Sequence, residues 1–402
     1  MQSLHSQIIE SLKSEEYIDR MAQLFGEDLT TLSFWGTEPL LTTSLICPAF
    51  SKLVAVFPKL KEVSFSTSMP SPGPLVELIK EASLHNLKVS VQVSLDGPAF
   101  ITDKNRFEGA SEVIPRNFFE VLSRIQDTKS PVNFHWKATT SINNIKEMVK
   151  DPSKFDACID YFNSLNEKFL KLNRNSLVTL TDRKYLPTLV VPGKYSSDDG
   201  KYFAEFLRNL RWKKNPSAYT ARMERLISSW DELGPRRMMF TCSGGDSNIG
   251  LGRNLHICHR SFYFDEEAYV DDVIKTGIEN WDISHFEQGT ISMVRKYFIV
   301  DPTNDYEVTR FTYALRSYHD FWRMKIGYDV AMLKELALVG QASRIYLHNE
   351  ELVELFSLFI ESGICCPMEN ILNTGSTHLT PLSLLRMFGN GAFEEILEDV
   401  RR

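Results

Sequence analysis

The chain has 402 residues, and at about 100–200 residues per domain this length favours two domains. Hydrophobic residues make up 43%, and 26 Phe, 14 Tyr and 6 Trp supply enough apolar surface to exclude a mostly disordered chain. The net charge is -7, which argues against a dedicated nucleic-acid or polybasic membrane binder, because a phosphate-binding surface needs surplus cations.

The N-terminal apolar run is short and broken by charges, unlike the apolar segment of a secretory signal. No window approaches the roughly 18 apolar residues that are needed to cross a bilayer. We therefore expect a cytoplasmic protein without a membrane partner. In a reducing compartment the six cysteines are expected to be thiols or metal ligands, and Cys47 and Cys158 are most simply buried core residues.

Helix-like and strand-like stretches alternate over the first 210 residues, beginning with a helical pattern over about 4–25. The strand candidates are 29–36, 62–68, 87–96, 132–140 and 186–191. The helical candidates between and after them lie near 43–57, 74–85, 115–127, 144–166 and 199–210. This alternation predicts βαβ units and an α/β fold with a parallel sheet, either open or closed into a barrel.

The character of the sequence changes after about residue 240. Residues 241–265 are rich in Gly, Cys and short β-like pieces, as in a turn-rich metal ribbon. Residues 305–361 have a mostly helical pattern, and 363–391 are rich in loop formers. We therefore predict one domain over 1–240 and a second over 241–402.

Polar segments follow two of the predicted strands. Residues 36–40 read Gly-Thr-Glu-Pro-Leu, where a Gly allows close approach of a ligand and a carboxylate can accept from an ammonium group. Residues 94–98 read Ser-Leu-Asp-Gly-Pro, with Asp103 and Arg106 downstream. Either segment alone is also consistent with an ordinary turn. Together they place polar groups at strand carboxyl ends, where parallel α/β folds bind ligands.

The two segments resemble those of the radical S-adenosylmethionine (SAM) enzymes, particularly the peptide- and protein-modifying branch with a SPASM or twitch extension. The resemblance covers roughly residues 25–265. In that family the first segment holds the SAM amino group, the second contributes to the SAM site, and a downstream Arg is a candidate for the SAM carboxylate. The resemblance thus assigns to cofactor binding the residues Gly36, Thr37, Glu38, Ser94, Asp96 and Arg106.

The departures from the family are large. Its defining Cys-x3-Cys-x2-Cys loop holds the [4Fe–4S] cluster that reduces SAM, yet no cysteine precedes Cys47 here. We expect this chain to lack that loop and the first barrel strand. The resemblance therefore implies an incomplete, about five-stranded parallel barrel, followed by a small SPASM/twitch-like α+β domain. SAM would be a cofactor only if a partner supplied the missing cluster.

The C-terminal cysteines also resemble the extension in part. Cys242 and Cys258, with Gly252 between them, nearly match its opening, and its last cysteine could correspond to Cys365 or Cys366. Four thiolates suffice for one auxiliary [4Fe–4S] cluster or one Zn, although adjacent cysteines rarely bind one metal together. The alternatives are that His259 is the fourth ligand, or that these are buried thiols of a site that has lost its metal. A further histidine, His135, lies on a predicted strand and is expected to be a hydrogen-bonded core residue.

Three functions are consistent with these residues. The chain is a cluster-deficient homologue that binds a peptide or protein partner, or a part of a split or truncated radical SAM enzyme, or a structural subunit of an assembly. We favour the first and third readings, because the thiolates that catalysis requires are missing. A five-stranded barrel also leaves two parallel edges that must be covered, so each reading leads us to expect a partner.

Overall fold

The computed structural model describes two long stretches, residues 14–34 without 26–28 and residues 38–181. It also describes shorter pieces at 188–189, 201–202, 205–206, 209, 250–251, 254–256, 292 and 295–312. Contacts divide the chain into one unit of residues 1–140 and 147–188 and a second of 141–146 and 189–402. The predicted boundary between residues 240 and 241 lies outside the described residues.

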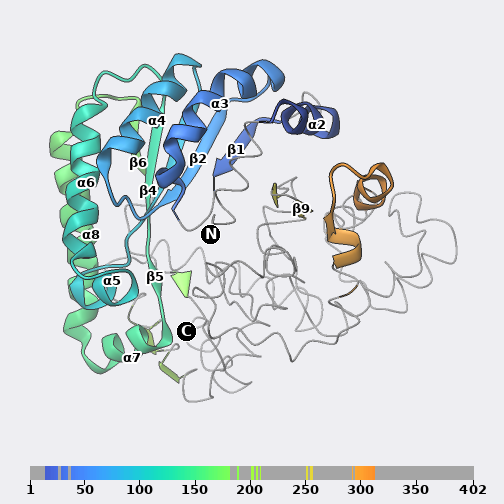
Figure 1. Cartoon of the computed structure of the whole chain (residues 1–402). Helices are drawn as coiled ribbons and strands as arrows, with labels where there is room; N and C mark the ends of the chain where they lie inside the picture. The colour runs from blue at the N-terminus through green and yellow to red at the C-terminus, as the bar shows by residue number, and fades with distance from the viewer. Residues whose placement is uncertain are drawn as a thin grey trace, which may run out of the picture. The chain divides into compact units, whose positions relative to one another are not determined.

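The first unit contains a parallel sheet of five strands, and this confirms the prediction of an α/β fold (Figure 1). The spatial order of the strands follows the order of the chain. They are β1 (Thr31–Phe34), β2 (Glu62–Thr67), β3 (Lys88–Ser94), β4 (Val132–Lys137) and β6 (Val178–Thr181).

The fifth strand of this sheet differs from the prediction. We expected it at 186–191, but β6 takes the place beside β4, and Val178 and Leu180 face the core. The pattern of β6 is only four residues long, and its start is set by a turn in which the Asn173 side chain donates to the Val178 carbonyl at 2.8 Å. Two residues of the predicted segment form β7 (Thr188–Leu189), which belongs to a two-stranded sheet with β5 (Thr139–Thr140).

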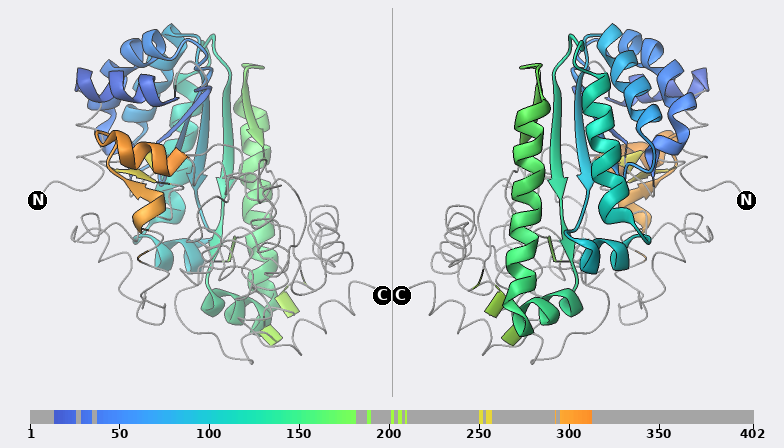
Figure 2. Two further views of the ribbon diagram at one scale, coloured as in Figure 1. Left: turned by 90° about the vertical axis from the view of Figure 1, so that its right-hand side faces the viewer. Right: turned by 90° about the vertical axis from the view of Figure 1, so that its left-hand side faces the viewer.

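Four helices lie along one side of the sheet (Figures 1 and 2). They are α3 (Thr43–Val56), α4 (Pro72–Leu84), α6 (Ala110–Arg124) and α8 (Pro152–Leu172). The predicted helix 144–166 is in fact two helices, α7 (Ile142–Lys150) and α8, because Asp151 caps α8 and accepts from the Ser153 amide at 3.1 Å. Pro152 then occupies the first helical position, where its missing N–H costs nothing.

The described part of the first unit also has three further helical segments. α2 (Glu15–Phe25) packs on α3 and forms the end of the predicted helix 4–25, but it begins after Ser14, which is not helical and whose hydroxyl accepts from the Tyr17 amide at 3.3 Å. The 3-10 helix η2 (Pro39–Thr42) follows β1, and α5 (Ala99–Asn105), which the sequence pattern did not predict, follows β3. Among the described residues no helix is both long enough and apolar enough to cross a membrane.

The core of the first unit lies between the sheet and its helices. Every second residue of each strand faces the helices, and paired residues form rows across the sheet. In one row Phe34 stacks on Phe65 with ring centroids 5.0 Å apart. From α6, Phe118 packs its ring against Phe134 at 5.1 Å and Trp136 at 4.6 Å. Burial of each such side chain stabilises the fold by about 1.5–3 kcal/mol.

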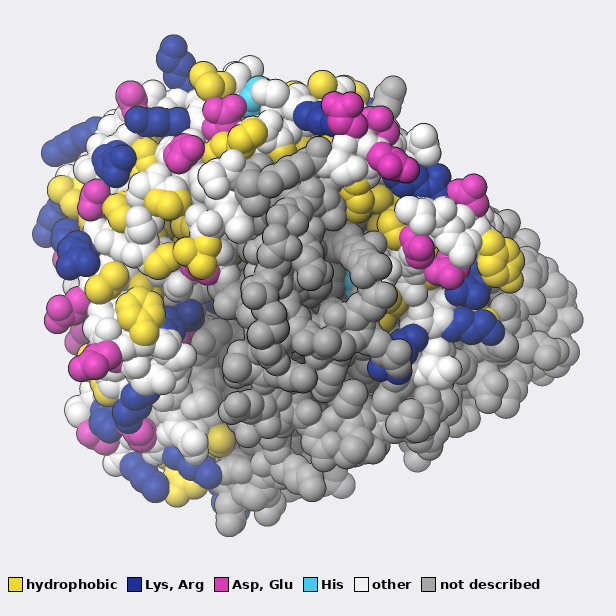
Figure 3. Space-filling view, in the orientation of Figure 1, with side chains coloured by type: hydrophobic (Ala, Val, Ile, Leu, Met, Phe, Trp, Pro, Cys, Tyr) yellow, Lys and Arg dark blue, Asp and Glu magenta, His cyan; other side chains and the backbone are white. Residues whose placement is uncertain are grey.

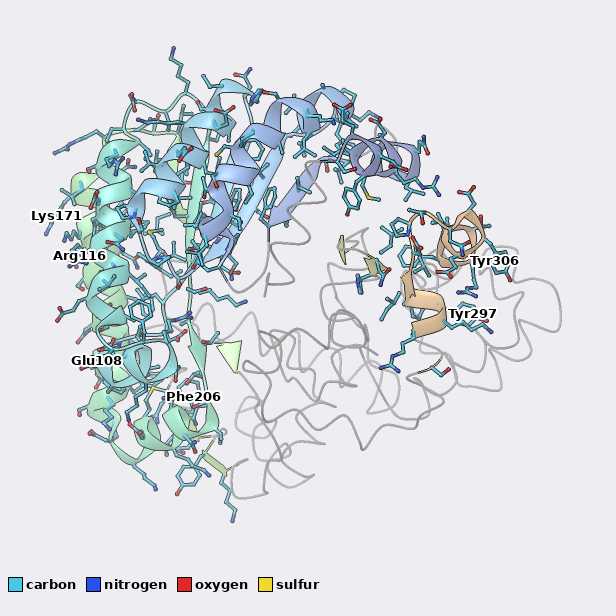
Figure 4. The ribbon with its side chains drawn as sticks, viewed as in Figure 1. Glu108, Arg116, Lys171, Phe206, Tyr297 and Tyr306 are labelled. Carbon is cyan, nitrogen blue, oxygen red and sulfur yellow. The ribbon has the colours of Figure 1, made fainter. Side chains whose placement is uncertain are left out.

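The outer surface of the helices is charged. Lys and Arg side chains are interspersed with Asp and Glu on the described part of the face in Figure 3. Arg116 on α6 and Lys171 on α8 point away from the strands (Figure 4), while other positions of the same helices are buried. These helices therefore have the amphipathic pattern of a layer that covers one face of a sheet.

The described part of the second unit contains a small antiparallel sheet in the order β10 (Ile299–Val300), β9 (Leu255–His256) and β8 (Gly250–Leu251). Tyr297 is buried, and the Arg310 guanidinium lies 5.7 Å from the ring centroids of both Tyr297 and Tyr306. Figure 4 shows the two tyrosines near each other.

Candidate functional site

The carboxyl ends of the parallel strands lie at one edge of the sheet, as in folds that bind ligands there. Glu38 follows β1, Ser68 follows β2 and Asp96 follows β3, while Ser94 is the last residue of β3 itself. The register pairs Ser94 with Lys137 on β4. The expectation that Glu38 and Ser94 lie at the same end of the sheet is therefore confirmed.

Glu38 is held by hydrogen bonds within the fold. Its Oε1 accepts from the Leu40 amide at 3.2 Å and from the Thr67 hydroxyl at 2.6 Å. Its Oε2 accepts from the Ser68 amide at 2.8 Å and from the Ser68 hydroxyl at 2.7 Å. A carboxylate has about four lone-pair sites, so these bonds use its full capacity. Glu38 thus caps η2 and ties the end of β1 to the end of β2.

Asp96 ties the next pair of strands in a similar way. Its side chain is fully buried, and Oδ1 accepts from the Thr139 amide at 2.8 Å and the Thr139 hydroxyl at 2.6 Å. The Arg106 Nη2 donates to the same oxygen at 2.8 Å, and Asn105 Nδ2 lies 3.4 Å from Oδ2. The guanidinium neutralises a carboxylate whose burial unpaired would be strongly destabilising.

Two of the predicted cofactor-binding residues keep hydrogen-bonding capacity. The Arg106 side chain is 18% exposed, and its buried Nε has no hydrogen-bond partner among the described residues. Arg106 has five N–H donors, of which one bonds to Asp96. The Ser94 hydroxyl is partly exposed at the end of β3. An anionic group and a polar atom of a ligand could therefore bind to these two side chains.

The turn after β3 supports this arrangement. Gly97 has φ +147°, a conformation that L side chains rarely adopt, and a Cβ there would lie 3.5 Å from the Cys158 sulfur. The Thr102 hydroxyl accepts from the Gly97 amide at 2.8 Å. Asp103 accepts from the Ser111 amide at 2.7 Å at the start of α6. Asp103 and Arg106 therefore have different partners: Asp103 accepts from the start of α6, and Arg106 donates to Asp96.

The other face of the sheet carries polar side chains in register on all five strands, a feature that our sequence reasoning missed. We call it the polar face, and its residues form four rows across the strands. The signal was present as strict alternation in the sequences of β2, β3 and β4. The rows are Thr31, Glu62 and Lys88; Ser33, Ser64, Ser90, Asn133 and Thr179; Ser66, Gln92, His135 and Thr181; and Ser94 and Lys137.

Hydrogen bonds join neighbours along the two longest rows, which we call the central rows. In one of them the Ser64 hydroxyl donates to Ser33 at 2.6 Å, and Thr179 donates to Asn133 Oδ1 at 3.0 Å. In the other, Gln92 Nε2 donates to Ser66 at 2.7 Å. The members of both rows are partly or fully exposed to solvent.

The structure also locates three residues that were expected in the core. Cys47 and Cys158 are buried, as predicted. Burial raises the pKa of Cys47 to about 12, with Glu77 and Glu81 adding to the shift, so this thiol is inert at neutral pH. His135 is hydrogen-bonded but lies on the polar face, with Nε2 3.4 Å from Gln92 Oε1, so its expected place in the core was wrong.

The remaining predicted site residues lie outside the described residues. These are Gly36, Thr37 and the four proposed metal ligands Cys242, Cys258, Cys365 and Cys366. Within the part of the chain that the structure describes, no group of three or more His, Cys, Asp or Glu side chains could hold a metal ion.

The residues at the carboxyl edge fit SAM only in part. Arg106 could meet a carboxylate, whereas Glu38 has no lone-pair site left for an ammonium group. Comparisons of the chain with protein-family models, with curated proteins and with solved structures find no match.

Proposed function

We propose that this protein binds a peptide or protein partner on the polar face of its sheet and does not catalyse a reaction by itself. The observation that carries the proposal is the polar face. All-parallel sheets are normally covered on both faces, and their strands read as nearly continuous apolar runs. Here alternate residues on all five strands are polar, and they remain partly or fully exposed.

The energetics of folding favour a binding role for these residues. A buried polar group without a hydrogen-bond partner costs about 1–3 kcal/mol, so a polar face gains nothing as a packing surface. Exposed hydroxyl and amide groups, by contrast, can exchange water for the groups of a ligand. At the carboxyl edge, Ser94 of the polar face and Arg106 also retain donors.

The two carboxylates at the edge support binding over acid–base chemistry. A general acid or base must exchange a proton with a bound substrate. Glu38 and Asp96 are instead buried, and their hydrogen bonds join the ends of successive strands.

In this proposal the sheet is an incomplete barrel of the radical SAM type, and residues 241–402 form a SPASM/twitch-like domain. Its four cysteines at 242, 258, 365 and 366 would hold at most one [4Fe–4S] cluster or Zn.

The second candidate is a part of a split radical SAM enzyme. It is favoured by Arg106, whose buried Nε and further N–H groups are placed at the strand ends like a carboxylate receptor. A partner chain would then have to supply the cluster whose electron cleaves SAM. Anaerobic assay of the chain with candidate partners, a reductant and SAM tests this reading. Formation of 5′-deoxyadenosine would support it and would contradict a purely binding role.

The binding function can be tested with a random dodecapeptide display library selected on the full chain. Selected peptides should bind the wild type more tightly than the variant Gln92→Leu, which removes the amide at the centre of the polar face. The matched control is Gln23→Leu on the exposed side of α2. We expect Gln92→Leu to weaken binding about tenfold or more, which corresponds to about 1.4 kcal/mol, and Gln23→Leu to leave it unchanged. Equal binding by both variants would contradict the proposal.

A further inference from the structure

The chemistry of the polar face indicates which class of ligand it takes, given the proposed function. The two central rows contain nine side chains, Ser33, Ser64, Ser90, Asn133 and Thr179 in one and Ser66, Gln92, His135 and Thr181 in the other. None of these is a Lys, Arg, Asp or Glu. Charges appear only in the outer rows, where Lys88 pairs with Glu62 at 2.9 Å and Lys137 lies beside Ser94.

A cationic group of a ligand over the central rows would lose hydration without gaining an opposite charge, and an anionic group would meet a positive charge only if His135 were protonated. Such uncompensated desolvation of a charge is strongly unfavourable. The central rows also contain no Phe, Tyr or Trp, and His135 is their one aromatic ring, so successive nucleobases have no series of rings on which to stack. Both arguments favour an uncharged polar ligand.

The hydrogen bonds within the rows leave donors and acceptors side by side. Gln92 Nε2 donates one proton to Ser66, so its second N–H can donate to a ligand, and the Ser66 hydroxyl keeps its own proton. Ser90, next to Gln92 on the same face of β3, has a hydroxyl that can both donate and accept. A group that both donates and accepts, as an amide does, matches this surface.

The spacing of the face matches an extended peptide. Residues two apart on one strand are separated by about 6.8 Å, and this is also the repeat of same-side groups in an extended chain. A peptide that runs along β3 and β4 would therefore place successive same-side amides opposite successive rows. On β3 the same-side residues are Ser90, Gln92 and Ser94.

From these observations we propose that the polar face binds an extended peptide segment whose contact positions are uncharged, through main-chain amides and small polar side chains. The inference rests on the proposed function, and the probe is the best-binding dodecapeptide from the display library. Each position of this peptide is replaced in turn by Ala, Lys and Glu. We expect Lys and Glu at every second position to weaken binding to the full chain about tenfold or more, and Ala to have a much smaller effect.

The outcomes separate this inference from the function on which it rests. If Gln92→Leu abolishes binding but Lys or Glu at the contact positions is tolerated or preferred, the ligand class is wrong while the binding site stands. If no selected peptide depends on Gln92, the proposed function itself fails. The variant Ser90→Leu provides a second test of the site, and circular dichroism shows whether each variant is folded.

Discussion

Removal of the Glu38 carboxylate is expected to destabilise the first unit. In Glu38→Ala two donors with little access to water lose their acceptor, the Leu40 amide and the Thr67 hydroxyl, whose residues are 2% and 1% exposed. Each buried donor left unsatisfied costs about 1–3 kcal/mol, while the partly exposed Ser68 groups can turn to water. We expect a loss of about 3 kcal/mol, because water entering the vacated space offsets part of the sum.

Urea denaturation followed by far-UV circular dichroism measures this loss, with the slope of the transition checked for two-state behaviour. Hydrogen exchange of residues 62–70 should become faster, because the carboxylate holds the end of β2. The control is Glu120→Ala on the outer face of α6, where the side chain is 50% exposed and a change within about 0.5 kcal/mol is expected. A loss in Glu38→Ala as small as that of the control would refute the reasoning.

Three further predictions concern ligands and pH. Calorimetry of the full chain with SAM should show no affinity tighter than roughly millimolar, about -4 kcal/mol, and micromolar binding would contradict the fit described for Glu38. Anaerobic loading with iron and sulfide, or with zinc, should yield at most one metal centre per chain. This centre should not form when Cys242 and Cys258 are both changed to Ser, and two centres per chain would contradict the proposed site. Hydrogen bonds from Lys104 and Lys154 lower the pKa of Glu147 in the folded protein. The ionised Glu147 therefore stabilises the fold at a pH above its unfolded pKa of about 4.3, and this stabilisation is lost as the pH falls through its lowered folded pKa. Glu147→Gln should therefore reduce stability by about 0.5 kcal/mol at pH 7 and have no effect in acid, and an effect that persists in acid would argue against the ion pair.

The sequence predicted the parts of the fold that depend on regular patterns. Strand segments such as β3 and helical segments such as α4 follow one another along the chain, and each has a clear apolar period. Their positions followed from these periods, and the parallel sheet followed from their alternation. The strand β6 was missed because four residues give too short a pattern, and its place depends on pairing with a strand 46 residues earlier. The break between α7 and α8 could have been read from Asp151 and Pro152, a capping residue followed by a helix-starting proline.

The candidate site was predictable in position but not in the roles of its residues. The location of Glu38 and Asp96 at strand carboxyl ends followed from the motifs, because parallel strands all end at one edge. Their partners did not follow, because Thr67 ends β2 and Thr139 comes just after β4, and only the register brings them near. The polar face was visible as alternation in each strand, but only the register shows that all the polar residues share one face.

Thiol labelling at position 90 measures whether the polar face is accessible to a ligand. Ser90→Cys places a thiol on β3 within a central row, and mass spectrometry gives its rate of alkylation by iodoacetamide in the native protein. Ser123→Cys on the exposed side of α6 and the buried natural Cys158 are the fast and slow references. We expect Cys at 90 to react within about tenfold of the rate at 123, and a bound peptide to suppress this reaction. A rate as slow as that of Cys158 would show that the chain itself covers this face and that the face is not the binding surface.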